Sequence, residues 1–177
     1  DQSSWILTWA FNLAMISARF DKIIKIDCDI YLSPDFIQKN NGFDRLSYNS
    51  FYTGDWQKSI QIHLNGQIVL KKTDFLRVNG YNEFLIKYGY DDTDLYSRLE
   101  LLGLTKLKIN DSSSGQIYMR HLDHSNEDRV RYMSAGQKDQ DLLEMIDHNR
   151  ILSQKTPWNR HCARHLYLTD GDTVYIV

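Results

Sequence analysis

Patterns typical of strands and of helices alternate along most of this chain, and this alternation limits its fold more than any other feature. The expected strands are 23–26, 67–70, 105–109 and 116–119. The expected helices are an amphipathic one from Ser3 or Ser4 to about Arg19 and three more at 73–78, 91–102 and 127–152. Because strands that alternate with helices form a sheet with covered faces, the order predicts an α/β fold of three layers.

Three other segments carry turn or loop signals. Pro34 is expected at the first position of a short helix. Residues 40–59 show no clear periodicity and are expected to form a loop. Asp170-Gly171 separates two β-rich runs, 166–168 and 173–177, and this arrangement predicts a hairpin near the end of the chain.

The composition is that of an ordinary soluble domain, with 42% hydrophobic and 25% charged residues in a chain of 177. No apolar run approaches the roughly 18 residues that span a bilayer, and the net charge of −2 gives no broad reason to expect nucleic acid as a partner. Cys28 and Cys162 are expected as free thiols, because a disulfide scaffold has more cysteines in a shorter chain. No signal pattern is present, so a cytoplasmic location is expected, with any contact to the inner membrane face made through other parts of the protein.

Two carboxylates, Asp27 and Asp29, follow directly on the short apolar run 23–26. Whether the strand continues or breaks there, both side chains can turn towards one hard cation such as Mg²⁺ or Mn²⁺, which prefers oxygen ligands. The same pattern is also common in solvated turns. The pair is therefore a candidate metal site that needs support from the rest of the chain.

Three acids, Asp91, Asp92 and Asp94, stand at the start of an expected helix, after Gly89 and Tyr90. Carboxylates in a first turn are favoured by the helix dipole and cap free amides, which accounts for one or two of them. Glycine beside tyrosine also lets the backbone approach a ligand closely. Both interpretations, a capped helix and a functional loop, remain open at this point.

Two imidazoles, His121 and His124, follow an expected strand. A single histidine in such a place is usually a surface residue. Histidine is also the commonest nitrogen ligand of divalent metals, and this chain already has Asp27 and Asp29. The combination favours a metal site that draws on both segments.

With these segments in this order, the chain resembles the glycosyltransferases of the GT-A fold. The likeness is strongest to the carboxy-terminal half shared by the β-galactosyltransferases and many bacterial, family 2-like sugar transferases. The resembling segments are 25–30, 66–70 with 75–81, 91–99 and 119–121, within about 5–131. The resemblance implies a GT-A fold without its first strands, with the metal and acceptor side of the catalytic domain in 1–152 and a tail with a hairpin in 153–177.

The resemblance also implies a metal site and a donor site. Asp29 matches the last acid of the family's Asp-x-Asp motif and is expected to bind Mn²⁺, or Mg²⁺, directly. Asp27 is expected to hold the donor ribose or to complete the surroundings of the metal. His121 matches the histidine that completes the metal site, and His124 is the competing candidate.

The acceptor side follows from the same resemblance. Asp92 matches the acid that takes the proton from the acceptor hydroxyl in inverting members. Asp91 stands where the family usually has a glutamate that binds acceptor hydroxyls, and Tyr90 replaces a glycine after Gly89. These four residues are the expected acceptor-binding and catalytic positions.

The resulting expectation is a metal-dependent, inverting glycosyltransferase of bacterial polysaccharide biosynthesis. It would move a hexose or N-acetylhexosamine from a nucleotide sugar, with UDP as the expected nucleotide, to a glycan acceptor. One alternative is a retaining transferase with the same metal site. The other is a non-catalytic carbohydrate-binding domain that uses four aromatic residues as stacking surfaces: Tyr48, Tyr52, Trp56 and Tyr90. The first three of these can also be core anchors.

Overall fold

A central sheet of four strands organises the computed structural model, which describes residues 6–45, 49–54, 64–85, 88–125, 142–155, 167–170 and 173–176. In spatial order the strands are β1 (Lys22–Lys25), β4 (Ile68–Lys71), β3 (Ser50–Thr53) and β5 (Thr105–Lys108). Strand β4 runs antiparallel to both of its neighbours, whereas β3 and β5 are parallel. The sheet is therefore mixed, and β1 lies at one of its edges.

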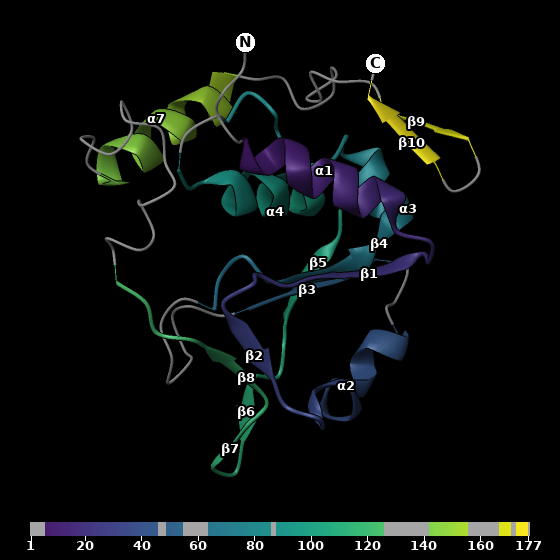
Figure 1. Cartoon of the computed structure of the whole chain (residues 1–177), viewed down its shortest axis with the longest axis vertical. Helices are drawn as coiled ribbons and strands as arrows, with labels where there is room; N and C mark the ends of the chain where they lie inside the picture. Colours follow the sequence, from purple (N-terminus) through teal and green to yellow (C-terminus); the bar gives the residue numbers. More distant parts are fainter. Residues whose placement is uncertain are drawn as a thin grey trace.

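Helices and short ribbons cover the two faces of this sheet (Figure 1). One face carries α1 (Leu7–Ser17), α3 (Lys72–Arg77) and α4 (Asp91–Leu101). The other carries α2 (Phe36–Lys39), the 3₁₀ turn η1 (Asn41–Arg45), and the ribbons of β2 (Ile30–Leu32) with β8 (Met119–His121) and of β6 (Ser112–Ser113) with β7 (Gln116–Ile117). Beyond the first helical layer, α7 (Leu142–Lys155) packs against α4, and β9 (Tyr167–Asp170) pairs with β10 (Thr173–Ile176). The expected three-layer α/β fold is confirmed.

Two hydrophobic cores lie on the two faces of the sheet. The core on the helical face includes Ile68 and Leu70 of β4, and the core on the ribbon face includes Val69 between them. Successive residues of a strand point to opposite faces, so a strand covered on both sides is apolar throughout. Each fully buried large apolar side chain stabilises the fold by roughly 1.5–3 kcal/mol.

Most expected elements are found within a few residues of their expected bounds, but the expected loop at 40–59 is wrong in part. It contains η1 and the central strand β3. The cause is burial on both faces, because Phe51 enters the helix-side core and Tyr52 packs against the ribbon-side core, which removes the alternation that marks a half-buried strand. The short helix α2 also begins at Phe36, two residues after the expected Pro34.

The end of the chain agrees with the expected hairpin, since β9 and β10 pair antiparallel. The expected boundary after residue 152 falls inside α7, which continues to Lys155. Residues 127–141 of the expected helix lie outside the described residues, as does Cys162, while Cys28 is a free, exposed thiol. No helix in the described ranges combines the length and apolar character needed to cross a membrane.

Candidate active site

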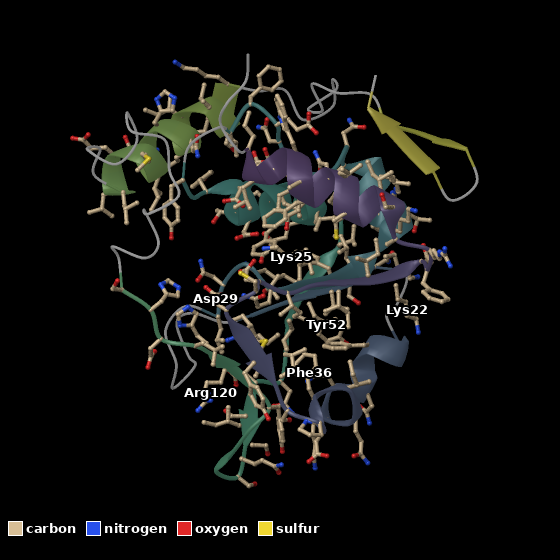
Figure 2. All side chains as sticks on the ribbon, in the orientation of Figure 1. Lys22, Lys25, Asp29, Phe36, Tyr52 and Arg120 are labelled. Atoms are coloured by element: carbon tan, nitrogen blue, oxygen red, sulfur yellow. The ribbon has the colours of Figure 1, made fainter. Side chains whose placement is uncertain are left out.

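The turn after β1 carries Asp29 to the β2–β8 ribbon. The amide of Ile30 donates to the Asp27 carbonyl at 3.1 Å, which closes the turn, and β2 then pairs with β8 so that Ile30 faces His121. The amide of Leu122 donates to the Asp29 carbonyl at 2.7 Å. Figure 2 shows Asp29 past the end of β1, beside this ribbon. Strand pairing therefore brings together residues that are about ninety positions apart in sequence.

Both histidines converge on Asp29. The Oδ2 atom of Asp29 lies 3.0 Å from Nε2 of His124 and 3.4 Å from Nε2 of His121, and one ligand atom from each residue lies within 4.8 Å of the others. The sequence left the choice between the two histidines open, and the structure places both in the group.

The geometry of this group fits a divalent cation. Two ligand atoms that each lie about 2.1 Å from one ion, at right angles to each other, are about 3 Å apart. The distances from Oδ2 of Asp29 to the two Nε2 atoms are close to this value. The Nδ1 atom of His124 lies 3.2 Å from the Ser125 carbonyl, and a proton held there leaves the Nε2 lone pair free for a metal. Ca²⁺ prefers oxygen ligands, whereas Mn²⁺ also accepts imidazole nitrogen. One carboxylate with two imidazoles therefore suits Mn²⁺ better than Ca²⁺.

Asp27 points elsewhere. Its Oδ1 atom lies 2.7 Å from the Lys25 ammonium, and its Oδ2 atom accepts a hydrogen bond from Nε2 of the buried Gln67 at 2.9 Å. The Asp27 amide in turn donates to Oε1 of Gln67 at 2.8 Å. Both carboxylate oxygens of Asp27 thus have partners within the protein, and the structure does not bring Asp27 into the group of Asp29 and the histidines.

Asp27 instead forms an acid cluster with Asp91 and Asp92 around Lys25. The Lys25 ammonium lies 3.7 Å from Oδ1 of Asp92, and the Tyr81 hydroxyl donates to the same oxygen at 3.4 Å. Burial, followed by the charge of Asp92, raises the pKa of Tyr81 well above its usual value, so its hydroxyl stays protonated and can donate. Asp92 thus contacts Lys25 and Tyr81 through Oδ1, and 20% of its side chain remains exposed.

Two members of the acid cluster, Asp91 and Asp92, have raised pKa values, and burial is the largest cause for both. Burial, followed by the charge of Asp92, raises the pKa of Asp91 to about 7, although the Lys25 charge acts in the opposite direction. Burial also raises the pKa of Asp92, and again Lys25 opposes the shift. Two neighbouring carboxyl groups with raised pKa values in a partly open site are a feature of candidate catalytic centres.

The raised pKa of Asp91 predicts a pH dependence of stability. Between its ordinary value of 3.8 and about 7 the folded protein holds a proton that the unfolded chain releases, so this contribution is present at low pH and lost as the pH rises through that window. The amide of Asp91→Asn mimics the protonated acid at every pH, so this variant lacks the loss of stability. We expect the difference in unfolding free energy, variant minus unsubstituted protein, to increase by more than about 1 kcal/mol from about pH 5 to about pH 8. Urea unfolding at the two pH values measures this, with Glu100→Gln on the exposed side of α4 as the control. Parallel pH profiles for the protein and Asp91→Asn would contradict the assignment.

Gly66 fits tightly against the acid cluster. Its φ is +93°, and a Cβ there would lie 2.8 Å from Oδ2 of Asp27 and 3.0 Å from Oδ2 of Asp92. Gly103 has the same φ of +93° with nothing within 4 Å of such a Cβ. The two glycines therefore share the cost of a left-handed conformation and differ in the contact.

We expect Gly66→Ala to destabilise the protein by about 1 kcal/mol or more beyond Gly103→Ala, because only the first substitution also crowds two carboxylates. Chemical unfolding of both variants measures the difference. Equal losses would mean that the acids move aside without cost.

The loop before α4 is bent and anchored. Gly89 and Tyr90 have φ values of +80° and +70°, and a non-glycine residue in this region is uncommon and often marks a functional site. The Gly89 carbonyl accepts from Nδ2 of the buried Asn149 of α7 at 2.8 Å. A Cβ at Gly89 would lie 2.6 Å from Ile146, so α7 sits directly against this loop. Half-buried Tyr90 stands next to Asp91 at the start of the helix.

The third acid of the helix start, Asp94, has a structural role. It accepts from the buried Arg98 at 2.9 and 2.6 Å and from the Ser153 hydroxyl at 2.6 Å. Arg98 also donates to the carbonyls of Val78 and Gly80 at 2.5 and 2.6 Å. This ion pair fixes the loop that carries Tyr81, whose hydroxyl donates to Asp92.

The sequence interpretation missed Lys25, Gln67 and Tyr81 as members of the site. A signal for Lys25 was present, since the strand period of two places it on the same face as Ile23, and a lysine on a buried face needs carboxylate partners. Gln67 and Tyr81 carry no comparable local signal, because their roles depend on the loops that meet Asp27 and Asp92.

Of the four aromatic residues proposed to stack on sugars, Tyr52 and Tyr90 lie within the described residues. Tyr48 and Trp56 lie outside the described residues. Tyr52 packs edge-on against Phe43 with ring centroids 5.1 Å apart, and its hydroxyl donates to the Gly42 carbonyl at 3.3 Å. Tyr52 therefore anchors the ribbon-side core.

This chain is similar to known proteins in sequence and in fold. Residues 45–125 match the sequence model of a family described as the N-terminal domain of galactosyltransferase. No curated protein matches the sequence. One similar solved structure is the catalytic domain of Drosophila β1,4-galactosyltransferase 7 in complex with xylobiose, with 15% identity, a TM-score of 0.58, and coverage of 96% of this chain and 69% of that one. Another is a mutant of that enzyme in complex with manganese, UDP-Gal and xylobiose, with 14% identity, a TM-score of 0.59, and coverage of 95% and 68%.

These likenesses establish the fold. The chain has a GT-A fold and resembles the β-galactosyltransferases, as the sequence motifs implied. The sequence match and the structural likeness together support a glycosyltransferase. The matched segment 45–125 includes the acids of α4 and both His121 and His124, whereas Asp29 lies before it.

Proposed function

We propose that this protein is a metal-dependent, inverting glycosyltransferase that moves a hexose or N-acetylhexosamine from a UDP-sugar to a glycan acceptor. The convergence of Asp29 with His121 and His124 carries this proposal, because a carboxylate and two imidazoles meet beyond the end of β1 in a GT-A fold. The solved relative in complex with manganese, UDP-Gal and xylobiose supports the choice of metal and of substrate classes.

The ligands of the proposed metal would be Asp29, His121 and His124, and the fit favours Mn²⁺ over Mg²⁺ because imidazole is a poor ligand for the harder ion. When bound, such an ion supplies positive charge opposite the diphosphate on which negative charge develops as it leaves. Contacts within the protein orient the ligands of this ion. The backbone bond from Leu122 to Asp29 and the contact of His124 with Ser125 hold the ligands in place.

In this proposal Asp92 is the general base. An acceptor hydroxyl has too high a pKa to attack unaided, so Asp92 takes its proton while the hydroxyl oxygen bonds to the anomeric carbon. The bond from that carbon to the diphosphate oxygen breaks with its electron pair, and attack opposite the leaving group inverts the anomeric centre. Asp91, with its raised pKa, and the neighbouring Gly89 and Tyr90 are proposed to bind the acceptor hydroxyls.

A crystal soak with Mn²⁺ and UDP tests the metal site independently of turnover. Anomalous scattering is expected to place one Mn²⁺ between Asp29, His121 and His124. No peak at that point, together with glycan binding that is indifferent to metal, would favour the non-catalytic carbohydrate-binding alternative. The anomeric configuration of the product of a donor screen, read by NMR, separates the inverting mechanism from the retaining one.

A further inference from the structure

Lys25 is a buried cation at the end of an edge strand. Along β1 the residues alternate between exposed and buried, so Lys25 shares the inward face with Ile23 while Lys22 is exposed. Its side chain is only 8% exposed. Figure 2 shows Lys25 on the side of β1 that faces α1 and α4, and its ionic contacts are with Asp27 and Asp92. A buried ammonium group is costly unless it is paired, so its partners explain its place.

Three contacts fix the Lys25 ammonium. It lies 2.7 Å from Oδ1 of Asp27, donates to the Gly66 carbonyl at 2.8 Å, and sits 4.1 Å from the centroid of the Phe11 ring. Gln67 holds the other oxygen of Asp27, so the partner that orients Lys25 is itself held. The ammonium is therefore set in position before any substrate binds.

Its contact with Asp92 is of another kind. At 3.7 Å from Oδ1 the ammonium attracts the carboxylate but lies beyond hydrogen-bond distance. At this separation Lys25 acts on Asp92 chiefly through its charge. Its charge also lowers the pKa of both Asp91 and Asp92 against the effect of burial.

We propose that Lys25 is a positioning residue, whose ammonium, anchored on Asp27 and the Gly66 carbonyl, holds the Asp92 carboxylate in place for transfer. The expected effect of Lys25 on catalysis rests on the proposed function, whereas the energetic coupling between Lys25 and Asp92 does not depend on it. The same ammonium joins the loop that leads to Asp29 with the start of α4, and so links the donor side of the site to the acceptor side.

A double-mutant cycle on stability tests the coupling. The variants are Lys25→Met, Asp92→Asn and the double substitution, unfolded by urea at about pH 8.5. Without Lys25, Asp92 becomes a carboxylate beside two others with no neighbouring cation, so Asp92→Asn should relieve repulsion there. We expect its effect on the unfolding equilibrium constant to differ at least about fivefold between the two backgrounds. Additive effects within about twofold would overturn the proposal.

Two further variants keep the cycle decisive. Lys22→Met removes the same charge from the exposed face of the same strand, and its cycle with Asp92→Asn is expected to be additive. Should Lys25→Met fail to fold, Lys25→Gln replaces it, since the amide still donates to Asp27 or to the Gly66 carbonyl without a charge.

Turnover supplies the second measurement. With Lys25→Met, kcat should fall by about ten- to a hundredfold while the acceptor KM changes less than about threefold, because the base is misplaced and the binding groups remain. An unchanged kcat would overturn the catalytic part of the proposal. If the unsubstituted protein transfers no sugar from any donor, the proposed function has failed, and the stability cycle still decides whether Lys25 holds Asp92.

Discussion

Replacing Asp92 with asparagine is expected to lower the turnover of sugar transfer by about a thousandfold, within the range that general acid–base catalysis supplies. The amide cannot take the proton of the acceptor hydroxyl, although it has nearly the same shape. The contacts of Asp92 are with Lys25 and Tyr81, and it is not part of the group formed by Asp29 and the two histidines. Binding of Mn²⁺ and UDP should therefore stay within about twofold of the unsubstituted protein, as measured by calorimetry beside the initial rates.

The matched control for this substitution is Glu100→Gln, which makes the same change of charge on the exposed side of α4. It should leave both transfer and binding unchanged. Weakened binding of UDP in Asp92→Asn would instead place Asp92 on the donor side and would count against its role as the base.

Replacing Asp29 with alanine is expected to weaken Mn²⁺ binding by more than about a hundredfold, because it removes the one carboxylate that the described residues bring to the proposed site; loss of a group outside the ligand set already costs about 10- to 100-fold. His121→Ala and His124→Ala should each weaken binding less, because the carboxylate and one imidazole remain. Titration of Mn²⁺ followed by electron paramagnetic resonance measures the free ion in each case without need of a substrate.

Asp123→Ala is the control for that series, since Asp123 lies between the two histidines in sequence but is exposed and is not in the group. Removing its charge should change the Mn²⁺ affinity by less than about threefold if exposed charges act weakly. Equal losses for Asp29→Ala and Asp123→Ala would mean that the ion is attracted by general negative charge, and that Asp29 forms ordinary ion pairs with the histidines.

Local patterns predicted the elements where one face is apolar or where a turn residue is distinctive. The helix at 91–102 was predicted because Leu95 and Leu99 repeat at helical spacing, and both are buried in the helix-side core. Helix α1 shows the limit of such patterns. Its expected apolar face included Leu13 and Ile16, yet its most buried positions include Thr8 and Asn12.

For Asn12 the reason for that difference is tertiary hydrogen bonding. Asn12 donates to the Tyr81 carbonyl at 3.0 Å and to Glu83 at 2.7 Å, and it accepts from the Tyr81 amide at 2.7 Å. A buried polar residue with such partners is stable, but its partners are about seventy positions away and leave no trace in the helical period.

The candidate site divides along the same line. The residue types alone, two acids after a strand, acids at a helix start and two histidines after another strand, indicated which chemistry we propose for this chain, because metal binding and proton transfer depend on carboxylate and imidazole groups. Only the tertiary structure decided which of those groups lie together. The pairing of β2 with β8 sets Asp29 beside both histidines, whereas Lys25 and Gln67 draw Asp27 towards Asp92. Two carboxylates one residue apart can face either way when a strand ends, and the partners that choose between these directions come from distant parts of the chain.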